Sequence, residues 1–167
     1  TIEVKNKFNP TEWTGENINN KKILIISEQG IGDTIQFFRY LYSVKENYNC
    51  EIIFYTDKNL KYLFKDAPFK IVSDLNNISN IDFYQNLLSL PGIFFKKNNQ
   101  IQKCINYINV DKINNQKWKK KLSEYNKPII ALTWQGSQNY LYDSQRSIKL
   151  SNLNKIIKNK KFKFIAL

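Results

Sequence analysis

Apolar runs alternate with segments of helical spacing along the first part of the chain. The runs at 22–27, 51–56 and 69–72 are short and rich in Ile and Phe, which favours buried strands. Between them, 33–48 and 58–65 carry apolar residues at helical intervals. Strands that alternate with helices predict a parallel sheet with crossover connections, so we predict an α/β, Rossmann-like fold.

The pattern is weaker in the middle of the chain. We predict a short strand at 81–85, followed by a helical turn at 86–90 that is broken by Pro91 and Gly92. A basic helix is predicted at 116–125.

A second strand–loop–helix–strand pattern follows this helix. An apolar run at 128–133 precedes a loop at 134–148, a helix at 150–158 and a strand at 162–167. This arrangement predicts the opening of another Rossmann-like unit.

These patterns divide the chain near Asn126. We predict an N-terminal domain over 1–126, whose residues 1–20 form a polar lead-in, and the beginning of a second domain over 127–167. Because the chain starts at Thr1 and contains no Met, we expect it to be part of a longer protein.

Two glycines and an aspartate lie at the turn between the strand at 22–27 and the next helix. In α/β sheets ligands bind at the carboxyl ends of strands, and a helix start attracts anions. Gly30 and Gly32 allow positive φ or a close approach to a ligand, and Asp33 is suited to cap the helix.

A polar stripe continues along the helix from this turn. Asp33, Gln36, Tyr40 and Ser43 share one face at helical spacing. The stripe is either the wall of a pocket or the solvent side of an amphipathic helix.

The net charge of +12 raises the question of a nucleic-acid partner. The 26 basic residues are scattered, however, and the chain is also rich in Asn and Ile. The basic helix at 116–125 is either a patch that binds nucleic acid or a helix face exposed to solvent. We expect no nucleic-acid partner. The only two arginines, Arg39 and Arg146, are suited to phosphate or carboxylate recognition.

The residue types present restrict the chemistry. There is no His, so a general base must be a carboxylate, Lys or Tyr. Cys50 and Cys104 lack a metal-ligand spacing, so we expect no metal site; free thiols and one disulfide both remain open. Ile35 occupies the third glycine position of a dinucleotide fingerprint, and no P-loop pattern occurs. No apolar run reaches 18 residues.

The string EQGIGDTIQFFRY resembles the start of the glycosyltransferase-like domain that follows tetratricopeptide repeats in many bacterial proteins. That domain is similar to the lipopolysaccharide heptosyltransferases of glycosyltransferase family 9, which have the GT-B architecture of two Rossmann-like domains. Further matching pieces occur in the same order: Trp13 and Gly15; Asp82 with Ser89-Leu90-Pro91; Trp134-Gln135-Gly136; Asp143; and Arg146-Ser147-Ile148.

The resemblance implies inverting, metal-independent transfer of a sugar from a nucleotide-sugar to a glycan, lipopolysaccharide or protein acceptor, without a cofactor. It makes Asp33 the candidate base and Arg146 a candidate phosphate ligand. It also implies a bacterial, cytoplasmic protein that can lie against a membrane and carry tetratricopeptide repeats. The candidate substrate- and donor-binding residues are Gln29, Gly30, Gly32, Gln36, Trp134, Gly136, Arg146 and Ser147.

The chain departs from the family in one respect. GT-B enzymes bind most of the donor through motifs beyond the first strands of the second domain, and this chain ends at Leu167. We therefore expect little or no turnover from these residues alone. The alternative is a catalytically inactive binding or scaffold module with the same fold.

Overall fold

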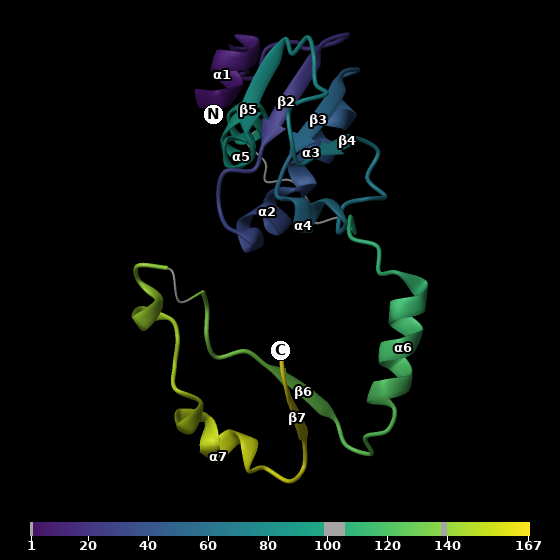
Figure 1. Cartoon of the computed structure of the whole chain (residues 1–167), viewed down its shortest axis with the longest axis vertical. Coiled ribbons are helices and arrows are strands. Elements are labelled where there is room, and N and C mark those ends of the chain that lie inside the picture. Colours follow the sequence, from purple (N-terminus) through teal and green to yellow (C-terminus); the bar gives the residue numbers. More distant parts are fainter. Residues whose placement is uncertain (1, 99–105, 138–139) are drawn as a thin grey trace. The chain divides into compact units, whose positions relative to one another are not determined.

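The structure is a computed structural model that describes residues 2–98, 106–137 and 140–167 (Figure 1). Its internal contacts divide the chain into two units, residues 1–109 and 110–167. The sequence analysis places the boundary near Asn126 and so assigns the basic helix to the first domain, whereas the contacts in the structure group this helix with the second unit.

The first unit is built on a five-stranded sheet in which all pairs of strands are parallel. The strand order is β1 (Thr11–Glu12), β5 (Phe83–Asn86), β2 (Lys22–Ile26), β3 (Glu51–Tyr55) and β4 (Lys70–Val72). The chain runs outward from β2 through β3 to β4 and then returns to the other side of β2. This is the order of a Rossmann-like half, so the predicted α/β class is confirmed.

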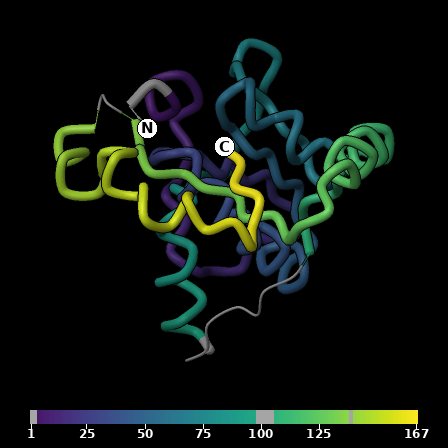
Figure 2. The backbone as a smooth tube through the Cα atoms, turned by 90° about the horizontal axis from the view of Figure 1, so that it is seen from below, coloured from purple at the N-terminus to yellow at the C-terminus, as the bar shows by residue number. Residues whose placement is uncertain are grey.

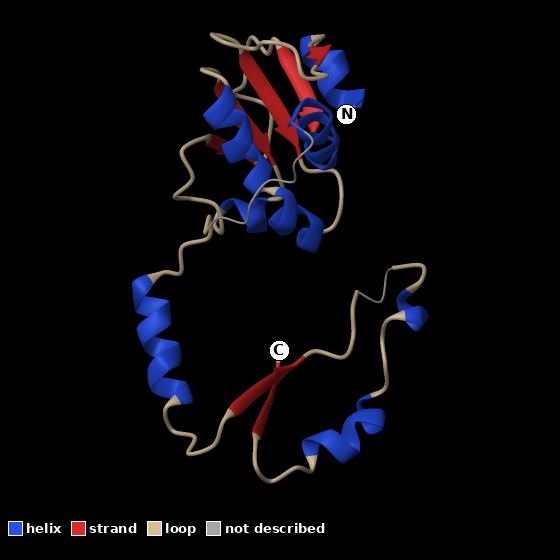
Figure 3. Cartoon of the chain, turned by 180° about the vertical axis from the view of Figure 1, so that it is seen from behind, coloured by secondary structure: helices blue, strands red, loops and turns tan. Residues whose placement is uncertain are grey.

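Short helices connect the strands (Figure 3). Helices α2 (Ile31–Phe37) and α3 (Arg39–Asn47) join β2 to β3, and α4 (Lys58–Lys61) joins β3 to β4. After β5 come a 3-10 helix, η1 (Leu87–Ser89), and α5 (Leu90–Asn98).

The central strand β2 is buried on both faces of the sheet, and it is apolar at every position after Lys22. Ile23 and Ile25 pack in a cluster with residues of α3, α5 and the segment after α4, whereas Leu24 and Ile26 pack in a second cluster with Val4. Strands covered on two sides read as continuous apolar runs, which explains why the sequence predicts them well.

Aromatic side chains fill the larger cluster. Phe38 is fully buried and stacks on Phe64 with the ring centroids 3.8 Å apart. Trp13 is also fully buried, and its indole Nε1 donates to the Glu16 carbonyl.

The polar lead-in contains two elements that the sequence analysis did not assign, the helix α1 (Ile2–Phe8) and the strand β1. The Thr11 and Trp13 amides donate to carbonyls of the β5 segment. The predicted break of the helix at Pro91 and Gly92 is wrong, because both lie in the first turn of α5, where proline's missing N–H has no helical partner to lose.

The second unit contains helix α6 (Lys112–Leu122) and a two-stranded parallel sheet of β6 (Ile129–Leu132) and β7 (Lys163–Ala166). The yellow end of the chain runs beside the green β6 segment (Figure 2). The connection holds three short helices: η2 (Asp143–Gln145), η3 (Leu150–Leu153) and α7 (Asn154–Ile157). Of the residues described in this unit, none is buried.

Candidate functional site

The glycine-rich turn lies at the carboxyl end of β2, as predicted, but its glycines have ordinary backbone angles. Gly30 precedes α2 with φ −63° and ψ 166°, and Gly32 is helical. Neither adopts the positive φ that the sequence suggested; among the glycines described, Gly15 does, at φ 118°. Gly32 borders open space, since an added Cβ there would contact nothing within 4 Å.

Asp33 does not cap α2, contrary to the prediction. The N-cap residue is Gly30, and Asp33 lies in the first turn, where the helix dipole favours a negative charge. Its Oδ2 lies 3.3 Å from the position of a Cβ added to Gly30, so the carboxylate folds back over the turn. Among the described residues, no hydrogen-bond or ion-pair partner of this carboxylate is found. Asp33 is therefore a half-exposed carboxylate at the ligand-binding edge of the sheet.

The predicted polar stripe is interrupted after its second member. The helix breaks at Phe38, which ends α2 and begins α3. Tyr40 and Ser43 are only 3% and 1% exposed, so they belong to the core and do not line a pocket. Gln36 is exposed, as is Gln29 in the turn. The pocket-wall interpretation therefore holds at most for Asp33 and Gln36.

Glu28 is a residue that the sequence analysis missed. Its carboxylate oxygens accept hydrogen bonds from the backbone N–H groups of Leu87 and Leu88, at 3.1 and 3.2 Å. The bonds join the loop after β2 to the start of η1, which directly follows β5, across the point where the strand order reverses. Ligands of open α/β sheets bind at that point. An acidic residue directly before the glycine-rich turn was the available signal.

Asp82 lies at the other end of the sheet, where the strands β2 and β5 begin. Its Oδ2 accepts from the Lys22 amide at 2.8 Å, at the start of β2, and its Oδ1 lies 3.9 Å from the Lys21 ammonium. This matching residue of the family pattern therefore holds the amino end of the sheet together and does not reach the glycine-rich turn.

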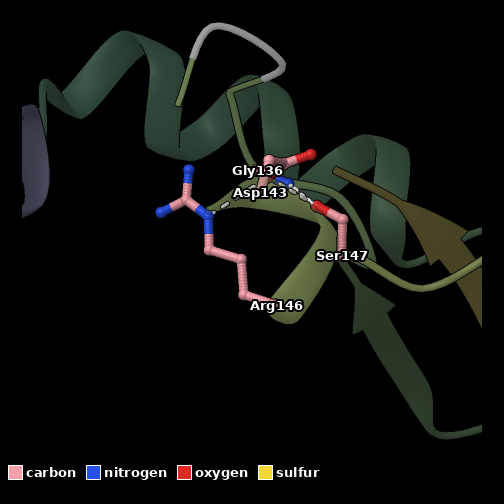
Figure 4. Close-up of polar contacts among 4 residues, drawn as sticks. All are labelled: Gly136, Asp143, Arg146 and Ser147. Atoms are coloured by element: carbon pink, nitrogen blue, oxygen red, sulfur yellow. Dashed lines mark hydrogen bonds and ion pairs between the residues drawn. The ribbon is translucent and has the colours of Figure 1, made fainter. Parts of the chain in front are cut away.

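The second unit brings three of its candidate residues, Gly136, Arg146 and Ser147, together around Asp143 in one hydrogen-bonded loop (Figure 4). Asp143 Oδ1 accepts from the Ser147 hydroxyl at 2.7 Å and from Arg146 Nε at 3.2 Å. The Ser147 hydroxyl oxygen in turn accepts from the Gly136 amide at 2.8 Å. Asp143 thus orders the loop.

Arg146 is held on three sides within this loop. Besides the Asp143 contact, its guanidinium lies 4.3 Å from the centroid of the Tyr140 ring. A Cβ added to Gly136 would meet the guanidinium at 2.6–2.7 Å, so only glycine leaves room for this arginine. The terminal Nη atoms have no acceptor among the described residues, and the side chain is half exposed. Those atoms are available to an anion.

Trp134 lies at the start of the same loop. It is half-buried and lines a mostly apolar pocket together with residues of β6 and β7, and its carbonyl accepts from the Ile148 amide at 2.9 Å. It fixes the base of the loop through the backbone, while Arg146 presents the charge.

Asp33 belongs to the first unit and Arg146 to the second. Within the described ranges, no cluster of three or more His, Cys, Asp or Glu is placed to hold a metal ion, and no helix is long and apolar enough to cross a bilayer. No protein-family model matches the chain, and neither a curated protein nor a solved structure matches it.

Proposed function

We propose that this chain is the acceptor-side domain, with the start of the donor-side domain, of a GT-B glycosyltransferase. The complete enzyme transfers a sugar from a nucleotide-sugar by an inverting, metal-independent reaction, and these residues alone are expected to give little or no turnover. The observation that carries the proposal is the Asp33 carboxylate, which has no partner among the described residues and stands at the carboxyl edge of a parallel sheet. The sequence resemblance to the heptosyltransferases supports the same reaction.

In this reaction Asp33 acts as the general base. It removes the proton from an acceptor hydroxyl while that oxygen attacks the anomeric carbon of the donor. The bond from the anomeric carbon to the diphosphate breaks, and the nucleoside diphosphate leaves with the electron pair. A carboxylate suits this role because the chain has no His.

Arg146 stabilises the leaving diphosphate. Asp143 and Tyr140 hold its guanidinium in place, so the free Nη atoms meet a phosphate without further ordering of the side chain. Gly136 and Ser147 support the same geometry. The acceptor is a glycan, lipopolysaccharide or protein, and the protein acts in the cytoplasm, where it can lie against a membrane and beside tetratricopeptide repeats.

The test is a nucleotide-release assay with UDP-, GDP-, ADP- and CMP-sugars, using the native full-length protein that contains these residues. We expect Asp33→Asn to lower turnover by about 10²–10⁴-fold, the usual contribution of a general base. Asp66→Asn, at an exposed acid elsewhere in the same unit, is the matched control and keeps full turnover. Undiminished transfer by a folded Asp33→Asn variant would contradict the proposal.

A second candidate function is a non-catalytic binding module. It is favoured by Glu28, whose carboxylate already accepts the hydrogen bonds of the Leu87 and Leu88 backbone N–H groups. These two donors are therefore not available to an anionic ligand at this point of the sheet. Under this reading no nucleotide-sugar is turned over by the native protein, and Glu28→Gln weakens only the fold. Detectable turnover that Asp33→Asn abolishes would exclude it.

A further inference from the structure

A polar pocket of about 400 Å³ opens at the carboxyl ends of β2, β3 and β4. None of its lining residues is among the candidate site residues of the glycosyl-transfer reading. They are Ser27, Tyr55, Thr56, Asp57, Lys58 and Ser73. The pocket adjoins the glycine-rich turn, because the Ser27 hydroxyl lies 2.6 Å from the hydroxyl of Thr34 in α2.

The lining combines four hydroxyl groups with one carboxylate and one ammonium group. Ser27 follows β2, Tyr55 and Thr56 stand at the end of β3, and Ser73 follows β4. Hydroxyls both donate and accept hydrogen bonds, so such a lining matches a ligand that itself carries several hydroxyls.

Thr56 supplies the strongest sign of an occupant. It is 5% exposed, and its Oγ1 is buried with no partner among the described residues. Buried hydroxyls are normally paired, because an unpaired one loses its bonds to water without compensation. The Oγ1 is covered by the surrounding protein, so its contact with a ligand requires a rotation about χ1 to another staggered position.

Asp57 and Lys58 define the charge of that ligand. Asp57 Oδ1 accepts from the Asn59 amide at 2.8 Å and caps α4, which leaves Oδ2 for a ligand hydroxyl. The Lys58 ammonium has no carboxylate within ion-pair distance among the described residues. A carboxylate flanked by hydroxyls suits a diol, and the neighbouring ammonium suits an anionic substituent.

We propose that this pocket binds a polyol that carries an anionic group. Two sources share this chemistry: a sugar phosphate or sugar acid, and the ribose phosphate of a nucleotide. Assignment of the ligand as the acceptor sugar rests on the proposed function, whereas the binding itself does not.

The experiment is a titration of the full chain, followed by NMR, with glucose 6-phosphate, glucuronate, glucose, inorganic phosphate and AMP. We expect glucose 6-phosphate or glucuronate to bind more tightly than either glucose or phosphate. Asp57→Asn and Lys58→Gln should each weaken that binding at least about tenfold. Asn retains the cap of α4, and Lys61→Gln, at an exposed lysine of the same helix outside the pocket lining, should leave the affinity unchanged.

Thr56→Val separates a binding role from a structural one. It removes the unpaired hydroxyl at nearly constant volume, so we expect a higher midpoint of thermal unfolding together with weaker binding. A residue that only supports the fold would not raise stability and lower affinity in the same variant.

Tighter binding of AMP than of the sugar phosphate also supports the pocket and assigns its ligand to the nucleotide side. The proposal is overturned if no probe binds up to about 10 mM. It is also overturned if phosphate binds as tightly as glucose 6-phosphate and Asp57→Asn has no effect, since the site is then for an anion alone. Absence of binding by every probe in a protein that does transfer sugar refutes only the pocket, whereas binding in a protein that transfers no sugar refutes only the glycosyl-transfer proposal.

Discussion

The two units of this protein have similar strand sequences and very different interiors. In residues 1–109, β2 has a paired strand on each side and an apolar cluster on each face. In residues 110–167, β6 pairs with β7, and of the residues described there none is buried. An apolar run thus predicts a strand in both units, but only the neighbours of the strand decide whether it forms a core.

This difference separates the roles of the units. The first unit has the packed interior that holds Asp33 at a fixed place on the sheet edge. The second unit holds Arg146 by a local network around Asp143, without support from a core. The free energy of unfolding should therefore come mainly from the first unit, so matched substitutions should cost more there than in the second unit.

Removal of a core ring tests this division with the largest expected effect. Phe38→Ala removes a fully buried ring that stacks on Phe64, so we expect a loss of about 3–5 kcal/mol in the free energy of unfolding. Phe164→Ala, the same change at a half-buried ring of β7, should cost less than about 1 kcal/mol. Urea unfolding followed by circular dichroism measures both. Equal losses would mean that the second unit shares the core's stability.

Substitution of one glycine in each unit, Gly15 and Gly136, compares the two units again, with a smaller expected change in the free energy of unfolding. Gly15 has φ 118°, and an added Cβ would lie 3.2 Å from Ile93 Cγ2, so Gly15→Ala should cost about 2 kcal/mol. Gly136→Ala should leave the free energy of unfolding nearly unchanged, because the clash there is with the end of the flexible Arg146 side chain. It should instead displace the guanidinium and weaken nucleotide-sugar binding by the native protein, as measured by calorimetry. A large loss of stability in Gly136→Ala would contradict the assignment of a purely local role to the loop.

The smallest expected effect is on the labelling rate of the Cys50 thiol, which reports how rarely the core of the first unit opens to solvent. The free thiol is buried, and burial raises its pKa, although Lys45 lowers it in part. The thiolate is the reactive form, so Cys50 should react more slowly at neutral pH than an exposed thiol of pKa about 8.5. Disulfide-exchange labelling of a Cys104→Ser variant, with and without denaturant, measures this rate. Fast labelling of the native protein would show that the core opens readily. Cys104 itself lies outside the described residues.

The sequence predicted the parts of the fold that depend on local pattern. The strands at β2, β3 and β6 read directly from apolar runs. Helix α1 and strand β1 were missed because their sequences are largely polar, and β1 exists only through its pairing with β5. Such a pairing has no signal in a short segment.

The candidate site was predicted in outline, and its details depended on tertiary contacts. Helical spacing predicted that Tyr40 and Ser43 lie on the same helix face as Asp33. The helix is interrupted at Phe38, however, and both side chains point into the core. Glu28 and the pocket around Thr56 depend on loops that meet only in the folded sheet. By contrast, Asp143, Arg146 and Ser147 lie close together in the sequence, and in the structure they form one hydrogen-bonded network.

Amide hydrogen exchange of the whole chain tests the central contrast most directly. Local opening is rare where strands are buried on both faces and frequent where they are not. We predict strong protection in β2 and β3, close to that of global unfolding, and weak protection in β6 and β7. Equal protection in the two sheets would contradict the account, because it would place a stable core in the unit where the structure shows none among its described residues.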